Sequence, residues 1–346
     1  PPQDAMIRKF EYVGRRLFLS IVVLLGLTVV TFTLTRMVPS NPAALYLGPR
    51  ARPADIERIN ERFGFDRPLA EQYAMYIQGL LRGDLGDSIA TKRPVLQELT
   101  DRLASTLELV MVATALSIAV GIPLGVFSAV SQGKRVDVGV RTLSIIGVSL
   151  PSFWLGLLLQ LVFANALGLL PVAGRIDSSL RFTSPIQEMT GFYLVDTLAT
   201  GNWVAFQDVL MHLILPAITL AAFPIGLIAR MTRASMLEVL AQNYIRTAKA
   251  YGISRGRIIY RYALKNAIAP TLTVIGLSFA FALTGAFYVE VIFNWPGLGL
   301  FTARSFLNLD YPAIMGMALF GAAGYIVINL LVDLVQAWID PRISVS

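Results

Sequence analysis

The residues of this chain that could do chemistry are few, and most of them are cations. Between Arg230 and Lys265, eight Lys and Arg side chains stand against a single acid, Glu238, so the segment carries +7, which equals the formal net charge of the whole chain. The chain has no cysteine and one histidine, His212, which excludes thiol nucleophiles and leaves little room for histidine metal sites. The segment is therefore a charged surface that something in the cytoplasm could contact, and not a catalytic centre.

Motifs for phosphate binding and for metal binding are not found. A Walker A loop ends in Lys followed by Ser or Thr, whereas the run 133–135 is Gly-Lys-Arg and lacks both the spacing and the hydroxyl. The turn 83–88 has too few carboxylates for an EF-hand loop. We therefore expect no catalytic residues, no bound metal and no cofactor in this chain.

Two helices joined by a tight turn are expected to position the cations. Residues 234–251 have a helical pattern, Gly252 suits the C′ position that ends a helix, and Ser254 suits the N-cap of a second helix starting at Arg255. Apolar stretches flank the segment on both sides, so this elbow is expected to lie at a membrane surface. A plain cytoplasmic loop is the alternative, and it would explain the charge but not the order helix, glycine, serine, helix.

Composition indicates an integral membrane protein. Of 346 residues, 55% are hydrophobic and 15% are charged, which no soluble domain of this size matches. The cations lie in short segments beside apolar stretches, as the positive-inside rule describes, and not in a surface for nucleic acid. A DNA-binding helix-turn-helix is disfavoured, because the apolar stretches leave no soluble three-helix core around the elbow.

Six apolar stretches predict an all-α membrane protein with both termini in the cytoplasm. Segments expected on the cytoplasmic side are basic, and those expected outside are balanced or acidic. The predicted spans are 17–35, 103–130, 142–170, 209–229, 267–293 and 313–339. The predicted cytoplasmic segments are 1–16, 131–141, 230–266 and 340–346, and the extracytoplasmic ones are 36–102, 171–208 and 294–312.

Several details complete the expected topology. The first apolar stretch is too long for the core of a signal peptide, which is the alternative there, and residues 1–5, ahead of Met6, are expected to be foreign to the natural chain. Short helices are predicted over 55–63, ending at Gly64, and over 69–81, followed by a turn cluster at 83–88.

Polar or kinked positions inside the spans are candidates for a pathway. A proline within a membrane helix frees carbonyl groups, although helix packing alone also explains such kinks. The Gly/Pro turn 294–299 is expected either to fold back as an outer gate or to anchor at the interface, and His212 to be hydrogen-bonded rather than a proton relay. The candidates are Ser149, Pro151, Ser152, Phe153, Thr284, Glu290, Trp295 and Pro296.

The elbow resembles the EAA loop of ABC importer permeases. Residues 244–252 contain the Ala-x-x-x-Gly core at Ala248 and Gly252, and the run 263–270 is similar to the apolar stretch ending in proline that follows it. The leading Glu-Ala pair of the looser consensus is replaced by Arg-Thr, as in the peptide-importer branch.

Further runs resemble the B-type permease of dipeptide and oligopeptide ABC importers over nearly the whole chain. Each is weak alone, but their order and spacing are specific. They lie at 83–88, 93–95, 106–109, 151–156, 170–174, 212–216, 229–235, 290–299, 310–312 and 340–342.

The resemblance implies a six-helix permease of the MetI-like type that forms half of a peptide pathway in the plasma membrane of a prokaryote. It implies a second, C-type permease, two ATPase subunits that bind ATP and Mg, and an extracytoplasmic binding protein as partners. Nickel, glutathione or another small solute is the alternative cargo, and a self-contained carrier or channel is the alternative class. The residues implied to contact an ATPase subunit are Tyr244, Ala248, Lys249, Ala250, Tyr251, Gly252 and Arg255.

Overall fold

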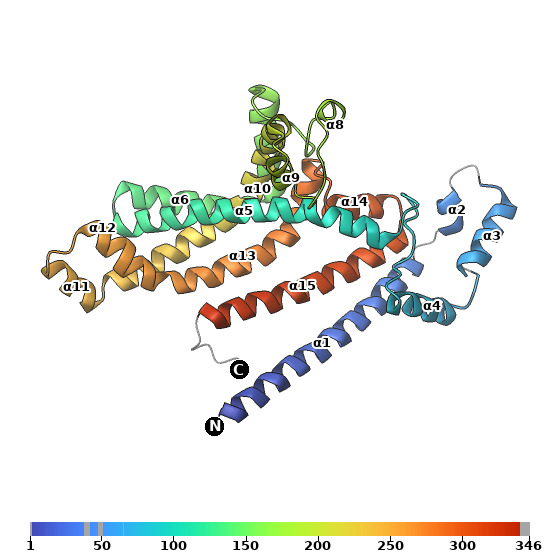
Figure 1. The fold of residues 1–346 in the computed structure, drawn as a ribbon, viewed down its shortest axis with the longest axis horizontal. Coiled ribbons are helices and arrows are strands. Elements are labelled where there is room, and N and C mark those ends of the chain that lie inside the picture. Colours follow the sequence, from blue (N-terminus) through green and yellow to red (C-terminus); the bar gives the residue numbers. More distant parts are fainter. Residues whose placement is uncertain (1, 38–41, 48–50, 65, 340–346) are drawn as a thin grey trace. The chain divides into compact units, whose positions relative to one another are not determined.

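The chain folds into helices, as a computed structural model shows (Figure 1). The backbone of residues 2–37, 42–47, 51–64 and 66–339 is described, and side chains are described over these ranges except at 2–17, 42, 45, 46, 62, 63 and 328–339. This described backbone contains no strand, only an isolated bridge between Asp87 and Pro94. The expected all-α class is confirmed for this part of the chain.

The helices fall into two compact units. The first contains α1 (Pro2–Met37), α2 (Pro42–Leu47), α3 (Pro53–Phe63), α4 (Leu69–Leu81), the start of α5 (Val95–Val130), and most of α14 (Leu298–Leu307) and α15 (Tyr311–Ile339). The second contains the rest of α5, then α6 (Arg135–Ser149), α7 (Ser152–Leu159), the π-helix η1 (Gln160–Ala166), α8 (Leu180–Thr183), α9 (Tyr193–Ala199), α10 (Trp203–Leu240), α11 (Asn243–Ala250), α12 (Arg255–Arg257), the π-helix η2 (Ile258–Leu264) and α13 (Lys265–Ile292).

Helix α10 organises the second unit. It packs against α6, α7, α9 and α13, and glycine allows its closest approaches. A Cβ on Gly125 of α5 would lie 2.7 Å from the carbonyl oxygen of Ala229 in α10. The apolar core of the unit includes Leu109 of α5, Leu213 of α10 and Phe293 at the end of α13. Helices α5, α10 and α13 therefore form one packed bundle.

A buried carboxylate organises part of the first unit. Asp310 lies directly before α15, and its side chain accepts hydrogen bonds from the Ser88 hydroxyl (2.5 Å) and the Ile89 N–H (3.0 Å). The predicted turn cluster at 83–88 is confirmed, with Gly83 and Gly86 both at positive φ. The turn and the start of α15 are therefore held together by one acid.

The two short helices predicted before the second span are confirmed. Helix α4 has the predicted limits, and α3 ends at Gly64, whose φ is +68°. Helices α5 and α10 begin at Val95 and Trp203, before the predicted spans 103–130 and 209–229. A polar first turn outside the apolar part is compatible with a continuous helix, so a helix can begin before the span that it contains.

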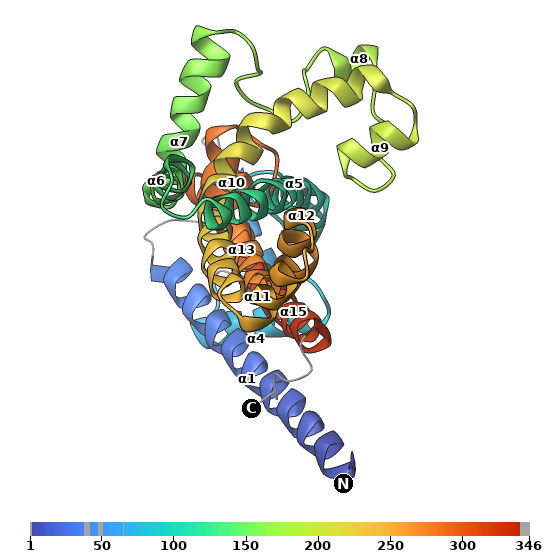
Figure 2. The same ribbon diagram turned by 90° about the vertical axis from the view of Figure 1, so that its left-hand side faces the viewer.

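The proline kink expected within the stretch 142–170 is present, and it is a full break between two helices. Helix α6 begins earlier, at Arg135, and meets the α7–η1 segment at a bend of 105° (Figure 2). Leu150 has an extended backbone with ψ 128°, the conformation that the following proline, Pro151, favours in its predecessor. The bend is therefore a local consequence of the sequence.

The predicted continuous helix over 234–251 is wrong. Helix α10 ends at Leu240, Gln242 is extended with ψ 152°, and α11 begins at Asn243. Asparagine favours helix ends because its side chain competes for backbone hydrogen bonds. The elbow is consequently separate from α10.

The number of spans is partly supported. Among the described residues, four helical stretches are long and apolar enough to cross a membrane: Phe18–Met37, Val95–Val130, Trp203–Leu240 and Arg255–Ile292. The bent pair α6–α7 supplies a fifth if it is one span, and the side chains of α15 are described only to Val327. A count of six, the span limits and the side of each loop stay predictions.

Candidate functional site

The elbow comprises residues 243–257, namely α11, a turn and α12. Helix α11 ends in a Schellman motif, in which the Gly252 N–H donates to the Lys249 carbonyl (3.0 Å) and the Ile253 N–H to the Ala248 carbonyl (3.2 Å). Gly252 has φ +71°, a conformation that glycine adopts without strain, so its expected C′ position is confirmed. Ser254 is at the N-cap of α12 as expected, but its side chain makes no capping hydrogen bond.

The inner face of the elbow is apolar. Ile245 is fully buried and Ala248 is 6% exposed. They belong to one apolar cluster with Val126 and Ala129 of α5 and Met236 of α10. Because such contacts involve both α5 and α10, the orientation of the elbow is set by the C-terminal ends of these two helices.

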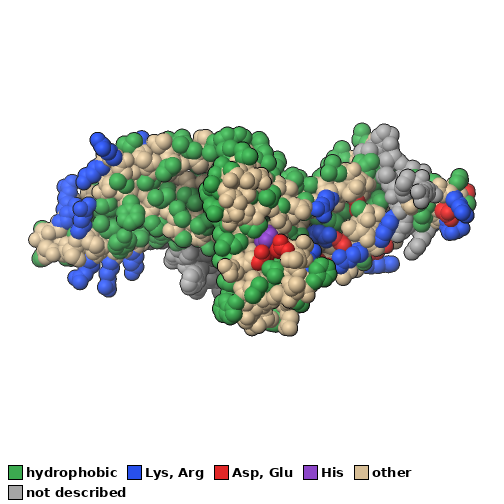
Figure 3. Space-filling view, turned by 90° about the horizontal axis from the view of Figure 1, so that it is seen from above, with side chains coloured by type: hydrophobic (Ala, Val, Ile, Leu, Met, Phe, Trp, Pro, Cys, Tyr) green, Lys and Arg blue, Asp and Glu red, His purple; other side chains and the backbone are tan. Residues whose placement is uncertain are grey.

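The outer face of the elbow is exposed and cationic (Figure 3). Tyr251 is 82% exposed at the turn, and Lys249, Ala250 and Arg255 are also exposed. The Tyr244 hydroxyl lies 3.0 Å from the side-chain nitrogen of Asn266, which donates to it. Among the residues expected to contact a partner, only Ala248 is buried, so the rest form a surface.

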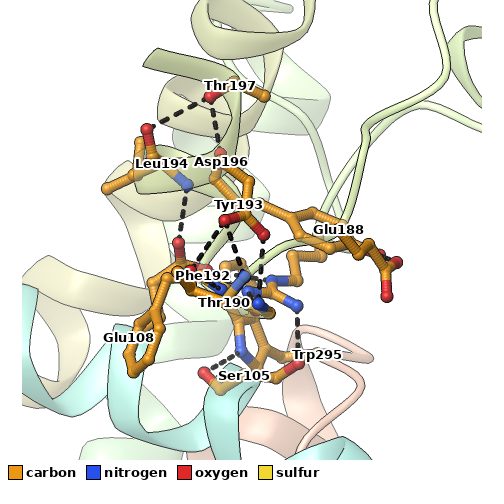
Figure 4. Close-up of polar contacts among 12 residues, drawn as sticks. Ser105, Glu108, Glu188, Thr190, Phe192, Tyr193, Leu194, Asp196, Thr197 and Trp295 are labelled. Atoms are coloured by element: carbon orange, nitrogen blue, oxygen red, sulfur yellow. Dashed lines mark hydrogen bonds and ion pairs between the residues drawn. The ribbon is translucent and has the colours of Figure 1, made fainter. Parts of the chain in front are cut away.

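A second polar site lies between α5 and the loop that follows η1 (Figure 4). The Arg175 side chain, 4% exposed, donates from Nε and Nη2 to Oε2 of Glu108 (2.9 and 2.6 Å) and from Nη1 to the Ser105 hydroxyl (2.7 Å). Its guanidinium carbon lies 3.6 Å from the centre of the Tyr193 ring. The Leu194 N–H donates to the other Glu108 oxygen (2.8 Å). This Arg175 cluster therefore anchors the start of α9 to α5.

The buried carboxylate of Asp196 holds the loop next to the Arg175 cluster. Asp196 accepts hydrogen bonds from the Gly191 N–H (3.0 Å) and from the N–H and hydroxyl of Thr190 (3.0 and 2.7 Å). Burial alone would raise the pKa of Asp196, but these bonds favour its charged form and the pKa lies below its ordinary value. Burial, reinforced by the hydrogen bond to Glu188, raises the pKa of Tyr193 to about 12. At neutral pH the loop thus holds a charged aspartate and a neutral tyrosine.

Two of the expected gate residues are buried. The Glu290 carboxylate accepts hydrogen bonds from the Thr106 hydroxyl (2.6 Å) and the Gly299 N–H (2.6 Å), and a Cβ on Gly297 would overlap this carboxylate. The Trp295 indole N–H donates to a backbone carbonyl of α5 (2.9 Å) and its side chain is fully buried. The turn is therefore held against α5, and the indole is not at an exposed interface in this structure.

The remaining pathway candidates lie elsewhere in the second unit. Residues 149–152 form the bend between α6 and α7, Phe153 is half-exposed on α7, and Thr284 is exposed on α13. A Cβ on Gly156 of α7 would lie 3.2 Å from the ring of Phe293, at the end of α13. Helix α7 thus contacts the chain just before the turn that contains Trp295 and the half-buried Pro296.

The ion pairs of the buried carboxylates Glu108 and Asp137 were not anticipated from the sequence. In the sequence, Arg175 and Arg233 were interpreted only as loop charges. In the structure, Arg233 donates a hydrogen bond to Asp137, and Arg175 donates one to Glu108. A signal was present, because an acid such as Glu108 inside an apolar helix needs a partner. The partner itself is 67 residues away in sequence, a distance over which spacing carries no information.

Other kinds of chemistry gain no support within the described residues. Residues 252–256 match the pattern Gly-x-Ser-x-Gly. That nucleophile motif requires a strand before the serine, whereas Ser254 follows the helix α11. No group of three His, Cys, Asp or Glu side chains there could hold a metal ion. The His212 ring lies 2.9 Å from the Asp208 carbonyl oxygen, consistent with the expected hydrogen-bonding role.

Two family models match the chain. Residues 121–345 match "Binding-protein-dependent transport system inner membrane component", and residues 9–110 match the N-terminal model of the corresponding membrane component. The chain is 45% identical over 324 residues to the probable D,D-dipeptide transport system permease protein DdpB of Escherichia coli K12, covering 94% of each chain. It is 43% identical to the dipeptide transport system permease protein DppB of Alkalihalophilus pseudofirmus, covering 96% of this chain and 99% of that protein.

More distant similarities agree with these. The oligopeptide transport system permease protein AppB of Bacillus subtilis is 37% identical, with 96% of this chain and 99% of that protein covered. A solved chain of the inward-facing MetNI methionine ABC transporter has a TM-score of 0.50 at 14% identity, covering 71% of this chain and 97% of that chain. At that identity the structural match supports the fold alone.

Proposed function

This chain belongs to the family of binding-protein-dependent transport system inner membrane components, and we propose that it is a permease subunit of an ATP-driven importer for dipeptides or oligopeptides. The named relatives are permeases for dipeptides, D,D-dipeptides and oligopeptides, and they align with almost the whole chain. The subunit forms half of a translocation pathway and has no ATPase site of its own. Nickel, glutathione or another small solute would be the alternative cargo for the same kind of permease.

The elbow carries the proposal. Its inner face packs on α5 and α10 through Ile245 and Ala248, while its outer face presents Tyr251 and several cations. An exposed aromatic ring among cations suits a cleft with an apolar floor and acidic walls. A push on this surface would move α5 and α10 together, which is what a contact with an ATPase must achieve.

The expected partners follow from this role. Two ATPase subunits would bind ATP and Mg and contact the elbow, and a second, homologous permease would supply the other half of the pathway. A binding protein outside the membrane would deliver the solute to the loop 171–208. The protein would lie in the plasma membrane of a prokaryote, with both termini in the cytoplasm.

The elbow contact is tested by changing its exposed side chains. We expect Lys249→Glu combined with Tyr251→Ala to prevent co-purification of the ATPase subunits and to abolish ATP-dependent uptake into proteoliposomes. Both side chains are exposed, so the chain itself should fold. Tyr288→Ala is the matched control, because Tyr288 is 55% exposed but belongs to α13, and this variant should retain the ATPase subunits.

Two outcomes would contradict the proposal. Retention of the ATPase subunits by the double variant would refute the elbow contact, and uptake by the chain alone without ATP would favour a self-contained carrier. The cargo is tested with the assembled complex and its binding protein, by comparing uptake of labelled dipeptides and oligopeptides with uptake of Ni²⁺ and glutathione. Uptake of Ni²⁺ or glutathione in preference to peptides would exclude the peptide assignment.

A further inference from the structure

An ion pair with a buried carboxylate lies beside the elbow. Asp137, at the start of α6, is 1% exposed, and Arg233 of α10 donates to both of its carboxylate oxygens, from Nε (2.7 Å) and from Nη2 (2.9 Å). Two parallel bonds of this kind fix the relative orientation of the two side chains. Arg233 is therefore unlike the exposed cations of the elbow, because it is partly buried and paired with an acid.

The same carboxylate binds two further segments. The Ser128 hydroxyl of α5 donates to Asp137 (2.6 Å), and so does the Gly133 N–H of the turn between α5 and α6 (3.0 Å). Four donors thus converge on one carboxylate, from α5, the turn and α10. Each segment is placed relative to the others by directional bonds, which apolar contacts do not provide.

This Asp137–Arg233 cluster occupies the helix ends on which the elbow packs. Ser128 lies between Val126 and Ala129, which belong to the apolar cluster that contains Ile245 of the elbow. Met236 of the same cluster lies one turn after Arg233 on α10. The elbow is thus joined to α5 and α10 by apolar contacts, and α6 is joined to the same two helices by the ion pair.

The far end of α6 leads to the bend at 149–152. Helix α6 also contacts α10 near this end. A Cβ on Gly226 would lie 2.6 Å from the backbone carbonyl oxygen of Ser144, and one on Gly147 would lie 2.9 Å from that of Ala222. With contacts at both of its ends, α6 has to follow α10. A displacement of the elbow would therefore reach the bend through α10 and α6.

We propose that Asp137 and Arg233 are positioning residues for transport, which make α6 and its bend move with the elbow when the ATPases act. The inference rests on the proposed role of the elbow as the ATPase contact. Without the pair, α6 retains its glycine contact with α10 but loses its placement beside the elbow. ATP hydrolysis would then continue with less of its motion reaching the bend.

The test compares coupling in the assembled complex. Asp137→Leu combined with Arg233→Met removes both charges, so neither is left without its partner. In proteoliposomes with the binding protein, we expect the number of peptides imported per ATP hydrolysed to fall about fivefold or more, the size of an ordinary coupling between sites. Asp101→Asn, which breaks the exposed pair with Arg93 (2.7 Å), is the matched control and should leave the ratio unchanged.

A second variant covers the case in which the double variant does not assemble. Arg233→Lys retains the charge but lacks the planar fork for two parallel bonds, and it should also lower the ratio. An unchanged ratio in an assembled variant, even with a lower melting temperature, would overturn the proposal, since the pair would then only stabilise the fold. The ATPase subunits should co-purify with these variants, whereas failure of the elbow proposal would appear as their retention by the Lys249 and Tyr251 double variant.

Discussion

The elbow and the Arg175 cluster are held in place by opposite means. In the elbow, Ile245 and Ala248 lie inside and the cations lie outside. In the loop around the Arg175 cluster, the charged groups Arg175 and Asp196 lie inside, while an apolar side chain, Phe182, is 87% exposed. The elbow has an apolar inner face and a cationic surface, whereas the loop encloses charged groups in addition to an apolar cluster of Ile176, Ala205 and Val209.

This difference predicts which of the two regions tolerates substitutions. Apolar packing is non-directional, so the exposed side of the elbow can vary without disturbing its placement. A buried ion pair adds little net stability, yet removing one member leaves a charge without a partner. The loop should consequently tolerate changes to its internal polar residues much less than the elbow tolerates changes to its surface.

The largest effect is expected from removing one charge of the Arg175 cluster. Arg175→Met leaves Glu108 buried without its cation and should lower the free energy of unfolding by about 3–5 kcal/mol. Chemical denaturation of the purified complex in detergent measures this change.

The double variant sharpens this result. Arg175→Met with Glu108→Met removes both charges and should recover most of the lost stability, because the remaining cavity is filled by apolar side chains. If the double variant were as unstable as the single one, the hydrogen bonds to Ser105 and Leu194 would dominate over the charge imbalance.

A smaller effect is expected from adding a methyl group at two glycines. Gly297→Ala would place a Cβ against the Glu290 carboxylate, and overpacking of this kind costs about 1–3 kcal/mol. Gly252→Ala meets no atom within 4 Å, but its φ of +71° costs a non-glycine residue about 1–2 kcal/mol. Denaturation of each variant gives the two values.

Gly256→Ala is the control for both glycines. It has open space around its Cβ and a helical backbone, so its stability should be unchanged or slightly raised. Equal losses at Gly297 and Gly256 would show that the turn at 294–299 is not packed as described.

The smallest effect on stability is expected for Asp196→Asn, and it depends on pH. Its pKa is lowered in the folded chain, so its stabilisation is fully present above the ordinary value of about 3.9 and is lost as the pH falls through the lower, folded value. Asp196→Asn should therefore be less stable than the parent at neutral pH, with a difference that narrows below about pH 4. Denaturation at a series of pH values tests this, and a constant difference would exclude a role for the carboxylate charge.

Local sequence signals predicted much of the elbow. Gly252 was placed at C′ because few other residues adopt its backbone conformation, and that prediction is confirmed. The break at Gln242 was missed. A kink at Pro151 was expected, but its size, a bend of 105°, was not. Periodicity over an apolar stretch does not reveal a bend, since both arms have the same composition.

The amino-acid sequence by itself determined the helical class, the membrane character and the shape of the elbow turn, because hydropathy and backbone preference act between near neighbours. Only the tertiary structure decided which charges meet. Arg175 reaches Glu108 across 67 residues and Arg233 reaches Asp137 across 96. These pairs depend on how glycine contacts let α5, α6 and α10 pack, so the partner of a buried charge is a property of the packed bundle.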